Sequence, residues 1–330
     1  MSEGDIEKGR VTLADVARDC GVSTMTVSNV VRGVQCVLPE TREKVERSLK
    51  RLGYRAEPML RALAAYRSQK GKAKPAYRAT VAFLEVESNE FISALFDYAR
   101  EEASYWGYKI ESFPLPEAPE QQRQLSRRLW KRGIQGAIIS PSRREKLLDG
   151  FETEHFTFVA INAFQSDIGC DVVGMDYFQG VTLAMQNCYA LGYRRMGLLL
   201  SETFDHLTEH RWRGAYYTFC EQWGISRCDM VLSDHSKISW KQVAATLKRG
   251  KVEVIFTVTA YDFMEKYLPG VQFVSLNDWM PQSGWWYIKT PRDLMAREAV
   301  RQLDYRLCHR LRGTYHDVHH ISLKAVWHGP

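Results

Sequence analysis

The chain has 330 residues, of which 45% are hydrophobic and 25% charged, and its formal net charge is +6. This length suits a small domain followed by a larger, two-lobed one. No stretch approaches the roughly 20 consecutive apolar residues of a membrane helix. The polar, acidic N-terminus does not resemble a signal peptide, and the seven cysteines are scattered without metal-ligand spacing. These features favour free thiols in a reducing cytoplasm.

The first predicted element is a short helix that begins after Thr12 and ends at Gly21. Leu13, Val16 and Ala17 recur at helical spacing and give this helix one apolar face. Thr12 suits a capped N-terminus. Gly21 suits a sharp turn because glycine adopts a positive φ at no steric cost. The spacing therefore predicts two short helices joined by a tight turn.

The second helix has an apolar inner side formed by Val27, Val30 and Val31. Its other side is small or uncharged and mostly polar, and carries Thr24, Met25, Thr26, Ser28 and Asn29. Such side chains suit a helix that enters the major groove of DNA, where short donors and acceptors reach base edges and phosphates. The alternative is an ordinary solvated face. A third helix, expected at 39–52, closes a small core.

The positive charge of the chain is concentrated at its N-terminal end. Residues 1–75 hold fifteen Lys and Arg and nine Asp and Glu, so their excess of six equals that of the whole chain. Residues 76–330 are therefore neutral overall. Neutralisation of DNA phosphates requires this kind of asymmetry.

From residue 78 onwards, apolar runs alternate with amphipathic stretches, which is typical of βαβ units. Strands are expected at 80–84, 108–113, 136–140, 156–161, 172–174, 196–200, 230–232, 254–258, 271–276 and 321–326, and helices at 91–106, 119–131, 180–191, 208–223 and 239–248. The pattern restarts after about residue 170, which predicts two parallel-sheet lobes in tandem. Ligands of such folds bind beyond the carboxyl ends of the strands.

Residues 11–54 resemble the headpiece of the LacI/GalR family of bacterial transcription regulators. The run from Val11 to Val31 matches the family pattern Val-Thr-x-x-Asp-Val-Ala-x-x-Ala-Gly-Val-Ser-x-x-Thr-Val-Ser-x-Val at nearly every position, with Cys20 in place of the usual alanine. By position, the resemblance implies base reading by Thr24, Met25 and Asn29. It implies contacts to phosphates or within the headpiece for Thr12, Ser23, Thr26 and Ser28.

The segment after Tyr54 resembles the hinge of the family. There a short helix orders on the operator and inserts leucines into the minor groove. Leu63 stands at the matching position, although Pro58 is shifted and Leu60 is larger than usual. The alternative is that Leu63 packs on the core domain.

In the core, Arg211-Trp-Arg-Gly214 resembles the family motif whose arginine contacts the effector, and Asn277 replaces the effector-binding aspartate. Guanidinium forks grip vicinal hydroxyls or carboxylates. A surface salt bridge is the alternative role for Arg211. Trp279 is a candidate for stacking on a sugar ring. Further candidates lie at predicted strand ends of the first lobe: Glu85, Glu87, Asn89, Ser140, Ser142 and Asn162. Gln179 is a similar candidate in the second lobe.

The predicted fold is α/β: an all-α helix-turn-helix headpiece is followed by a two-lobed, periplasmic-binding-protein-like core of parallel sheets flanked by helices. The expected domains are the headpiece at 1–56, a hinge and linker at 57–76, and the core at 77–330. Within the core, the N-lobe is expected at about 77–164 and 291–315, and the C-lobe at about 165–290 and 316–330. Because the chain lacks C-terminal leucine heptads, we expect a homodimer.

No catalytic, cofactor or metal motif is found in the sequence, so an enzyme is not expected. The expected function is a cytoplasmic transcriptional repressor that binds an inverted-repeat DNA operator, controlled by a small-molecule effector of carbohydrate type. Two alternatives stay open. One is a constitutive dimeric DNA-binding regulator whose core no longer binds a ligand. The other is a binding protein or enzyme without a DNA role.

Overall fold

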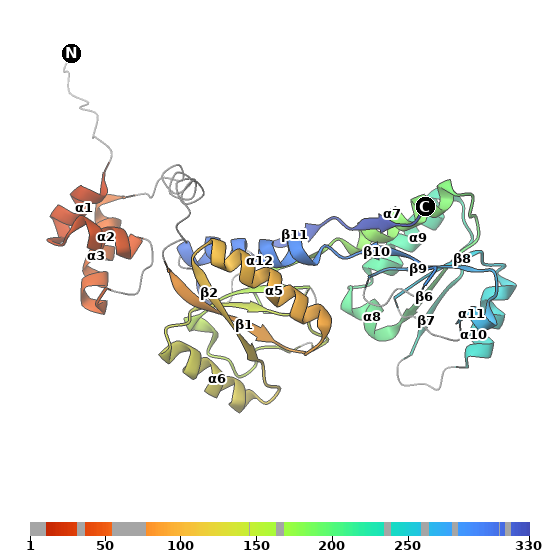
Figure 1. Ribbon diagram of the computed structural model, residues 1–330, viewed down its shortest axis with the longest axis horizontal. Helices are drawn as coiled ribbons and strands as arrows, with labels where there is room; N and C mark the ends of the chain where they lie inside the picture. The colour runs from red at the N-terminus through yellow and green to blue at the C-terminus, as the bar shows by residue number, and fades with distance from the viewer. Residues whose placement is uncertain are drawn as a thin grey trace, which may run out of the picture.

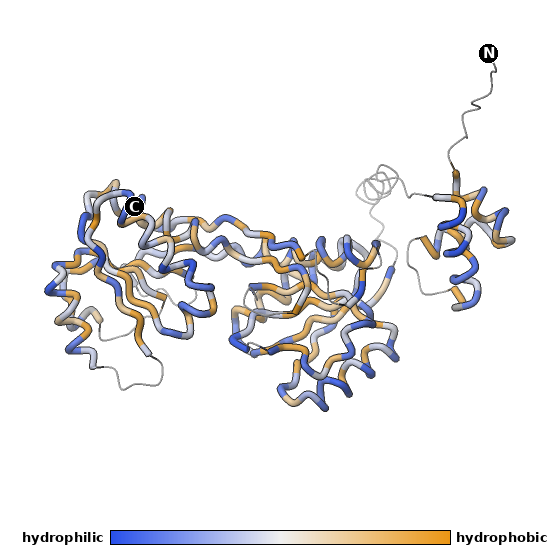
Figure 2. Tube along the Cα trace, turned by 180° about the vertical axis from the view of Figure 1, so that it is seen from behind, coloured by the Kyte–Doolittle hydropathy of each residue, from blue (hydrophilic) through white to orange (hydrophobic). Residues whose placement is uncertain are grey.

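The computed structural model describes residues 11–31, 37–54, 77–144, 146–162, 168–233, 239–258, 264–278, 283–309, 311–313 and 318–330. Three short helices form a headpiece at one end of the molecule, and two α/β lobes follow it (Figure 1). Apolar segments follow the strands at the centre of each lobe, while hydrophilic segments are concentrated on the outer helices (Figure 2). The expected fold class is confirmed by this architecture.

The headpiece, residues 11–54, consists of α1 (Leu13–Cys20), α2 (Thr24–Val31) and α3 (Pro39–Leu52). Its core is built from fully buried valines of all three helices: Val16, Val27, Val30 and Val45. Thr12 and Asp15 form a reciprocal capping box at the start of α1. Gly21 ends α1 with φ 63°, which permits the sharp turn before α2.

The first lobe contains a parallel sheet with strand order β11-β5-β4-β3-β1-β2. Its elements are β1 (Ala79–Glu85), α5 (Glu90–Tyr105), β2 (Tyr108–Pro114), α6 (Pro119–Lys131), β3 (Gly136–Ile139), the 3-10 helix Thr153–His155, β4 (Thr157–Ile161), β5 (Asp171–Met175), α12 (Arg292–Cys308) and β11 (His320–Leu323). Helices α5 and α12 cover one face, and α6 covers the other. Strands β3, β4 and β5 are buried throughout because both faces are covered.

The second lobe contains a sheet with strand order β12-β10-β9-β8-β6-β7, parallel except for the β10–β12 pair. Its elements are α7 (Tyr177–Ala190), β6 (Met196–Ser201), α8 (Glu202–Leu207), α9 (Arg211–Trp223), β7 (Asp229–Leu232), α10 (Trp240–Arg249), β8 (Val254–Thr257), α11 (Met264–Tyr267), β9 (Gln272–Ser275), β10 (Trp286–Lys289) and β12 (Val326–His328). Helices α7 and α9 pack together on one face, and α10 and α11 pack on the other.

The chain passes between the lobes three times: from β5 to α7, from β10 to α12, and from β11 to β12. The three crossing segments lie along the upper side of the molecule in Figure 1. The lobe boundaries expected at 164/165 and 315/316 differ from this topology, because β5 and β11 both belong to the first sheet. The single strand expected at 321–326 is likewise two strands, one in each lobe. The pairing of β5 with β4 and β11 assigns these strands to the first lobe. The hydrophobic periodicity of the sequence does not predict which strands pair.

A buried polar network joins β5, α12 and β11 in the first lobe, at the ends of these elements that lie away from the crossings. Asp171 at the start of β5 accepts a hydrogen bond from Arg306 Nε of α12 at 2.6 Å and pairs with the rest of the guanidinium. Gln302 Nε2 and the backbone N–H of His319 also donate to Asp171, the latter at 2.9 Å. Burial opposes ionisation of Asp171, but these hydrogen bonds outweigh it and hold its pKa below the usual value.

We expect Asp171→Asn to lower the free energy of unfolding by about 3–5 kcal/mol at pH 7, because it leaves the Arg306 guanidinium buried without a counter-charge. The measurement is urea unfolding followed by circular dichroism. Arg127→Gln is the matched control. It removes an exposed ion pair, with Glu152 at 2.7 Å, and should change stability by no more than about 1 kcal/mol.

The same network predicts a pH dependence. Since the folded-state pKa of Asp171 lies below its unfolded value, its stabilising effect is complete above about pH 4 and is lost as the pH falls further. The difference in stability between wild type and Asp171→Asn should therefore shrink below about pH 4. A difference that stays constant from pH 7 to pH 3 would contradict the assignment.

Candidate functional site

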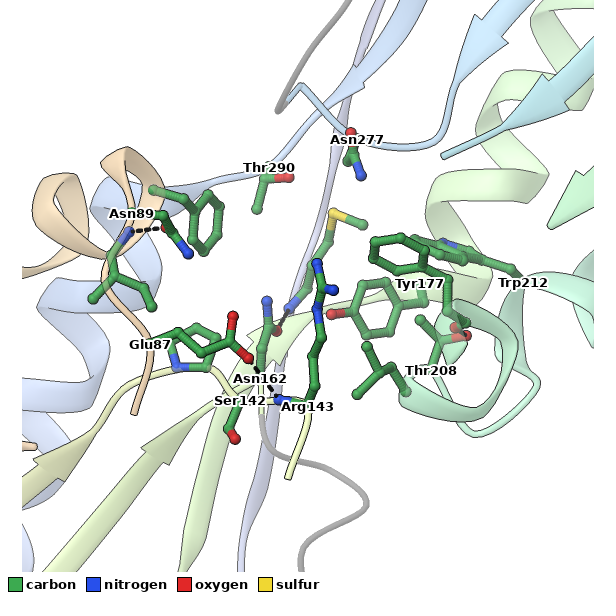
Figure 3. Close-up of a pocket in the computed structure, with 16 residues that line it drawn as sticks. Glu87, Asn89, Ser142, Arg143, Asn162, Tyr177, Thr208, Trp212, Asn277 and Thr290 are labelled. Atoms are coloured by element: carbon green, nitrogen blue, oxygen red, sulfur yellow. Dashed lines mark hydrogen bonds between the residues drawn. The ribbon is translucent and has the colours of Figure 1, made fainter. Parts of the chain in front are cut away.

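A cleft lies at the junction of the two lobes, at the carboxyl ends of strands from both sheets (Figure 3). Its volume is about 130 Å³. The first lobe and the crossing segments contribute Glu87, Asn89, Phe91, Ile92, Pro141, Ser142, Arg143, Asn162, Met175 and Thr290, and the second lobe contributes Tyr177, Phe204, Leu207, Thr208, Trp212 and Asn277. Parallel α/β sheets generally bind ligands at this edge.

On the first-lobe side, the loops after β1 and β3 are held together by hydrogen bonds. Ser140 Oγ accepts from the Val86 N–H at 3.0 Å, and Glu87 Oε1 accepts from the Arg143 N–H at 3.2 Å. The Glu87 carboxylate therefore fixes the backbone that carries Arg143. From there the Arg143 side chain extends toward Tyr177 and the second lobe (Figure 3). Its guanidinium carbon lies 5.4 Å from the centre of the Phe204 ring, so this one side chain spans the cleft.

Two asparagines reach the cleft from helix and strand ends of the first lobe. Asn89 caps α5, and its Oδ1 accepts from the Ile92 N–H at 3.0 Å. Asn162 follows β4 with φ 50°, a conformation that asparagine tolerates better than most residues. Its Oδ1 accepts from the Met175 N–H at 3.1 Å. In both residues the oxygen supports the fold and the amide nitrogen remains for the cleft.

The second-lobe wall is mainly aromatic. The Tyr177 and Trp212 rings meet edge to face with their centroids 5.2 Å apart, and Phe204 lies 6.4 Å from Trp212. Burial raises the pKa of Tyr177 well above its usual value, with nearby Arg211 acting in the opposite direction. Trp212 is buried, and its Nε1 has no hydrogen-bond partner among the described residues. This wall thus combines apolar surface with an unused N–H donor.

The structure brings Asn89, Asn162 and Asn277 together in the cleft, and also Glu87 and Ser142. Other candidates lie elsewhere. Glu85 is the last residue of β1, and Gln179 Oε1 accepts from the Ala325 N–H at 3.0 Å, which ties α7 to the β11–β12 crossing. Ser140 supports the loop described above. Trp279 falls outside the described residues.

Arg211 is also not among the described residues that line the cleft. Its Nη2 pairs with Glu209 Oε2 at 2.5 Å at the start of α9. Further polar or aromatic residues of the cleft are not among those predicted from the sequence, including Arg143, Tyr177, Phe204, Thr208 and Thr290. Arg143 and Tyr177 each lie three residues after the end of a predicted strand, at 140 and 174, so their position was a usable signal. The others depend on which loops the two lobes bring face to face.

In the headpiece, α2 presents its polar side away from the valine core. Met25 is 64% exposed and Thr24 is also exposed, whereas Ser28 and Asn29 are half-buried. Ser23 Oγ accepts from the Thr26 N–H at 3.1 Å and bonds to Thr26 Oγ1 at 2.9 Å. The Ser23 hydroxyl, like that of Thr12, thus accepts from a backbone N–H at the start of a helix. Leu63 lies outside the described residues.

Within the described part of the chain, no group of three or more His, Cys, Asp or Glu side chains is arranged to hold a metal ion. None of the described helices is both long enough and apolar enough for a bilayer crossing.

Comparison with known proteins places both parts of the chain. The family model described as "Bacterial regulatory proteins, lacI family" matches residues 12–57. The model described as "Periplasmic binding proteins and sugar binding domain of LacI family" matches residues 78–261, which is more than half of the chain.

Among curated relatives, the chain is 24% identical over 212 residues to the HTH-type transcriptional regulator KdgR of Bacillus subtilis, which covers 63% of this chain and 59% of that protein. It is 34% identical over 130 residues to catabolite control protein A of Staphylococcus epidermidis, covering 39% of this chain and 36% of the relative. The matched segments thus span less than two thirds of either relative.

Solved structures show the same fold over nearly the whole chain. A transcriptional regulator CelR–cellobiose complex has a TM-score of 0.55 at 20% identity, covering 97% of this chain and 99% of that one. The lac repressor dimer bound to operator and an anti-inducer has a TM-score of 0.54 at 18% identity, covering 97% and 98%. With both family models matched in order, the chain belongs to the LacI family of bacterial regulatory proteins.

Proposed function

We propose that the protein is a sequence-specific transcriptional repressor that binds an inverted-repeat DNA operator as a homodimer and is controlled by a small molecule in the cleft. The observation that carries the proposal is the combination of an exposed, uncharged α2 face with a two-lobed core whose cleft is lined by aromatic and polar side chains. Action on DNA would place it in the cytoplasm.

The case for DNA binding rests on α2 and on charge. The valine side of α2 packs against α1 and α3, so the opposite side, with the exposed Thr24 and Met25, faces solvent and can enter a major groove. The excess positive charge in residues 1–75 suits the phosphates on either side of that groove. By position, Thr12, Ser23, Thr26, Ser28 and Asn29 would hold phosphates or read bases, and Leu63 would enter the minor groove.

The case for control by a ligand rests on the connection between the lobes. Three crossing segments join them, so a molecule that contacts both walls of the cleft can bind the closed arrangement more tightly than the open one. That difference in affinity is the requirement for shifting a conformational equilibrium. Asn89, Asn162 and Asn277 would contact this effector, with Trp212 and Tyr177 as its apolar platform.

Homologous structures support the same assembly and ligand type. One is a dimer of the lac repressor bound to operator, and another is a regulator in complex with cellobiose. For this chain, a homodimer and a carbohydrate-type effector are therefore the proposals with the most support.

One observation favours a second candidate, a constitutive regulator whose core only dimerises. Arg211, the residue expected to grip the effector, pairs with Glu209 instead of lining the cleft, and Asn277 stands where the family resemblance places a charged carboxylate. Calorimetry of the full chain against mono- and disaccharides and their derivatives separates the two. Heat of binding together with a change in operator affinity excludes the constitutive regulator.

We expect a double Thr24→Ala, Met25→Ala variant to lose about five- to hundredfold in affinity for a duplex selected from random DNA, because direct base contacts are worth about 1–3 kcal/mol. Binding to unrelated DNA should change little. The measurement is fluorescence anisotropy at several salt concentrations. Arg128→Gln, on the exposed side of α6, is the control. Wild-type affinity that is indifferent to salt would contradict operator binding by the headpiece.

A second prediction concerns the cleft. Asn162→Gly keeps the backbone at positive φ, since glycine adopts it freely, but removes the amide. The concentration of effector needed for half-maximal change in operator binding should rise about two- to tenfold, as expected for one lost hydrogen bond. An effector response identical to wild type would place the ligand elsewhere.

A further inference from the structure

We infer that the ligand of the cleft carries an oxyanion, a carboxylate or a phosphate, and that Arg143 binds it. This inference rests on the proposed function, in which the cleft is the effector site. It follows from an imbalance between the hydrogen-bond donors and acceptors that the cleft walls leave unused.

The acceptors of the first-lobe wall are largely occupied by backbone N–H groups. Glu87 Oε1 accepts from Arg143 N, Asn89 Oδ1 from Ile92 N, and Asn162 Oδ1 from Met175 N, at 3.0–3.2 Å. Each of these bonds is part of a loop, a helix cap or a strand end. A ligand that competed for these oxygens would leave a backbone N–H without a partner, which is costly when buried. Glu87 Oε2 is the remaining carboxylate acceptor on this wall.

The donors, in contrast, remain available. The side-chain nitrogens of Asn89 and Asn162 make no hydrogen bond with any described residue. Trp212 is 3% exposed, and its Nε1 has no partner among the described residues. A buried polar atom without a partner is rare in native proteins and often indicates a ligand or water that completes it. Three N–H donors, two from the first lobe and one from the second, thus belong to residues that line one cleft (Figure 3).

Arg143 adds a positive charge that lacks a carboxylate partner. Neighbouring arginines are committed elsewhere: Arg144 donates to the carbonyls of Leu115 and Val86 at 3.1 and 3.2 Å, and Arg292 pairs with Asp278 at 2.7 Å. No described carboxylate lies within 4 Å of the Arg143 guanidinium, whose described contact is the Phe204 ring. A planar fork of N–H donors over an aromatic face is well suited to a carboxylate or phosphate.

The cleft also offers a surface for the rest of the ligand. The aromatic rings of Tyr177 and Trp212 form one side of it, which suits the apolar face of a small molecule. An oxyanion between Arg143 and the second lobe would draw the guanidinium from Phe204 and bridge both lobes. The acidic group of the effector would thus contact both lobes and favour their closed arrangement.

The test is calorimetry of the full chain with matched probes: D-glucose, D-gluconate, D-glucuronate and D-glucose 6-phosphate, and the corresponding galactose series. We expect an acid or a phosphate ester to bind at least tenfold more tightly than its neutral parent. Comparison of the acids with the esters identifies which oxyanion the cleft takes. Loss of one charge-assisted contact in Arg143→Gln should weaken that binding about ten- to hundredfold.

Two further variants separate charge from folding. Arg143→Lys keeps the charge without the fork and should give an intermediate loss. Asn89→Asp keeps the oxygen that caps α5 but replaces the donor with a negative charge, so it should weaken an anion more than a neutral sugar. Arg128→Gln removes an exposed positive charge from α6 and should bind all probes as wild type does.

The inference is overturned if no anionic probe binds, or if a neutral sugar binds as tightly as its acid and Arg143→Gln leaves its affinity unchanged. A neutral sugar that binds as tightly as its acid and alters the operator affinity of the wild-type chain would overturn only the oxyanion and leave the proposed function in place. If the chain binds an anion through Arg143 but selects no DNA sequence, the proposed function is overturned and the oxyanion site remains.

Discussion

The buried pair of Asp171 and Arg306 is the interaction on which the two-lobed arrangement depends. It joins the start of β5, the end of α12 and, through His319, the start of β11. Each of these elements leads into or out of a crossing between the lobes. An ion pair without solvent is stable only when its hydrogen bonds are complete, so the three segments must be in register together. The first lobe therefore holds together the three elements that lead to the second lobe.

Other contacts join the crossings at their opposite end, beside the cleft. Gln179 Oε1 accepts from Ala325 N, and Arg292 of α12 pairs with Asp278 after β9. None of these four residues is among the described residues that line the cleft.

The cleft shows how structural and binding roles are divided within single side chains. Asn89 and Asn162 each use the oxygen to complete a helix cap or a strand end and leave the nitrogen toward the cleft. The same arrangement of the fold that satisfies the backbone thus gives the cleft its excess of donors. Because the donors come from both lobes, a ligand rich in acceptors favours the closed state over the open one.

The sequence by itself determined the headpiece, because its information is local. Helical spacing, the capping box of Thr12 and Asp15, and Gly21 at positive φ act within a few residues, and the three helices form where the pattern predicts them. The alternation of strands and helices likewise predicted two parallel-sheet lobes, since strands buried on both faces read as apolar runs.

Only the tertiary structure decided which lobe owns β5 and β11, because strand pairing joins residues more than a hundred positions apart. It also decided the cleft. Asn89, Asn162 and Asn277 were predictable from strand and helix ends, but Arg143 reaches the cleft only because Glu87 holds its loop, and it meets Phe204 only because the lobes face each other. Gln179 and Arg211 have suitable side chains for binding, yet each contacts a neighbouring group instead. Gln179 accepts from Ala325 N, and Arg211 pairs with Glu209. The sequence determines the type of each side chain. Whether that side chain can bind a ligand depends on the hydrogen-bond and ion-pair partners that the tertiary structure places beside it.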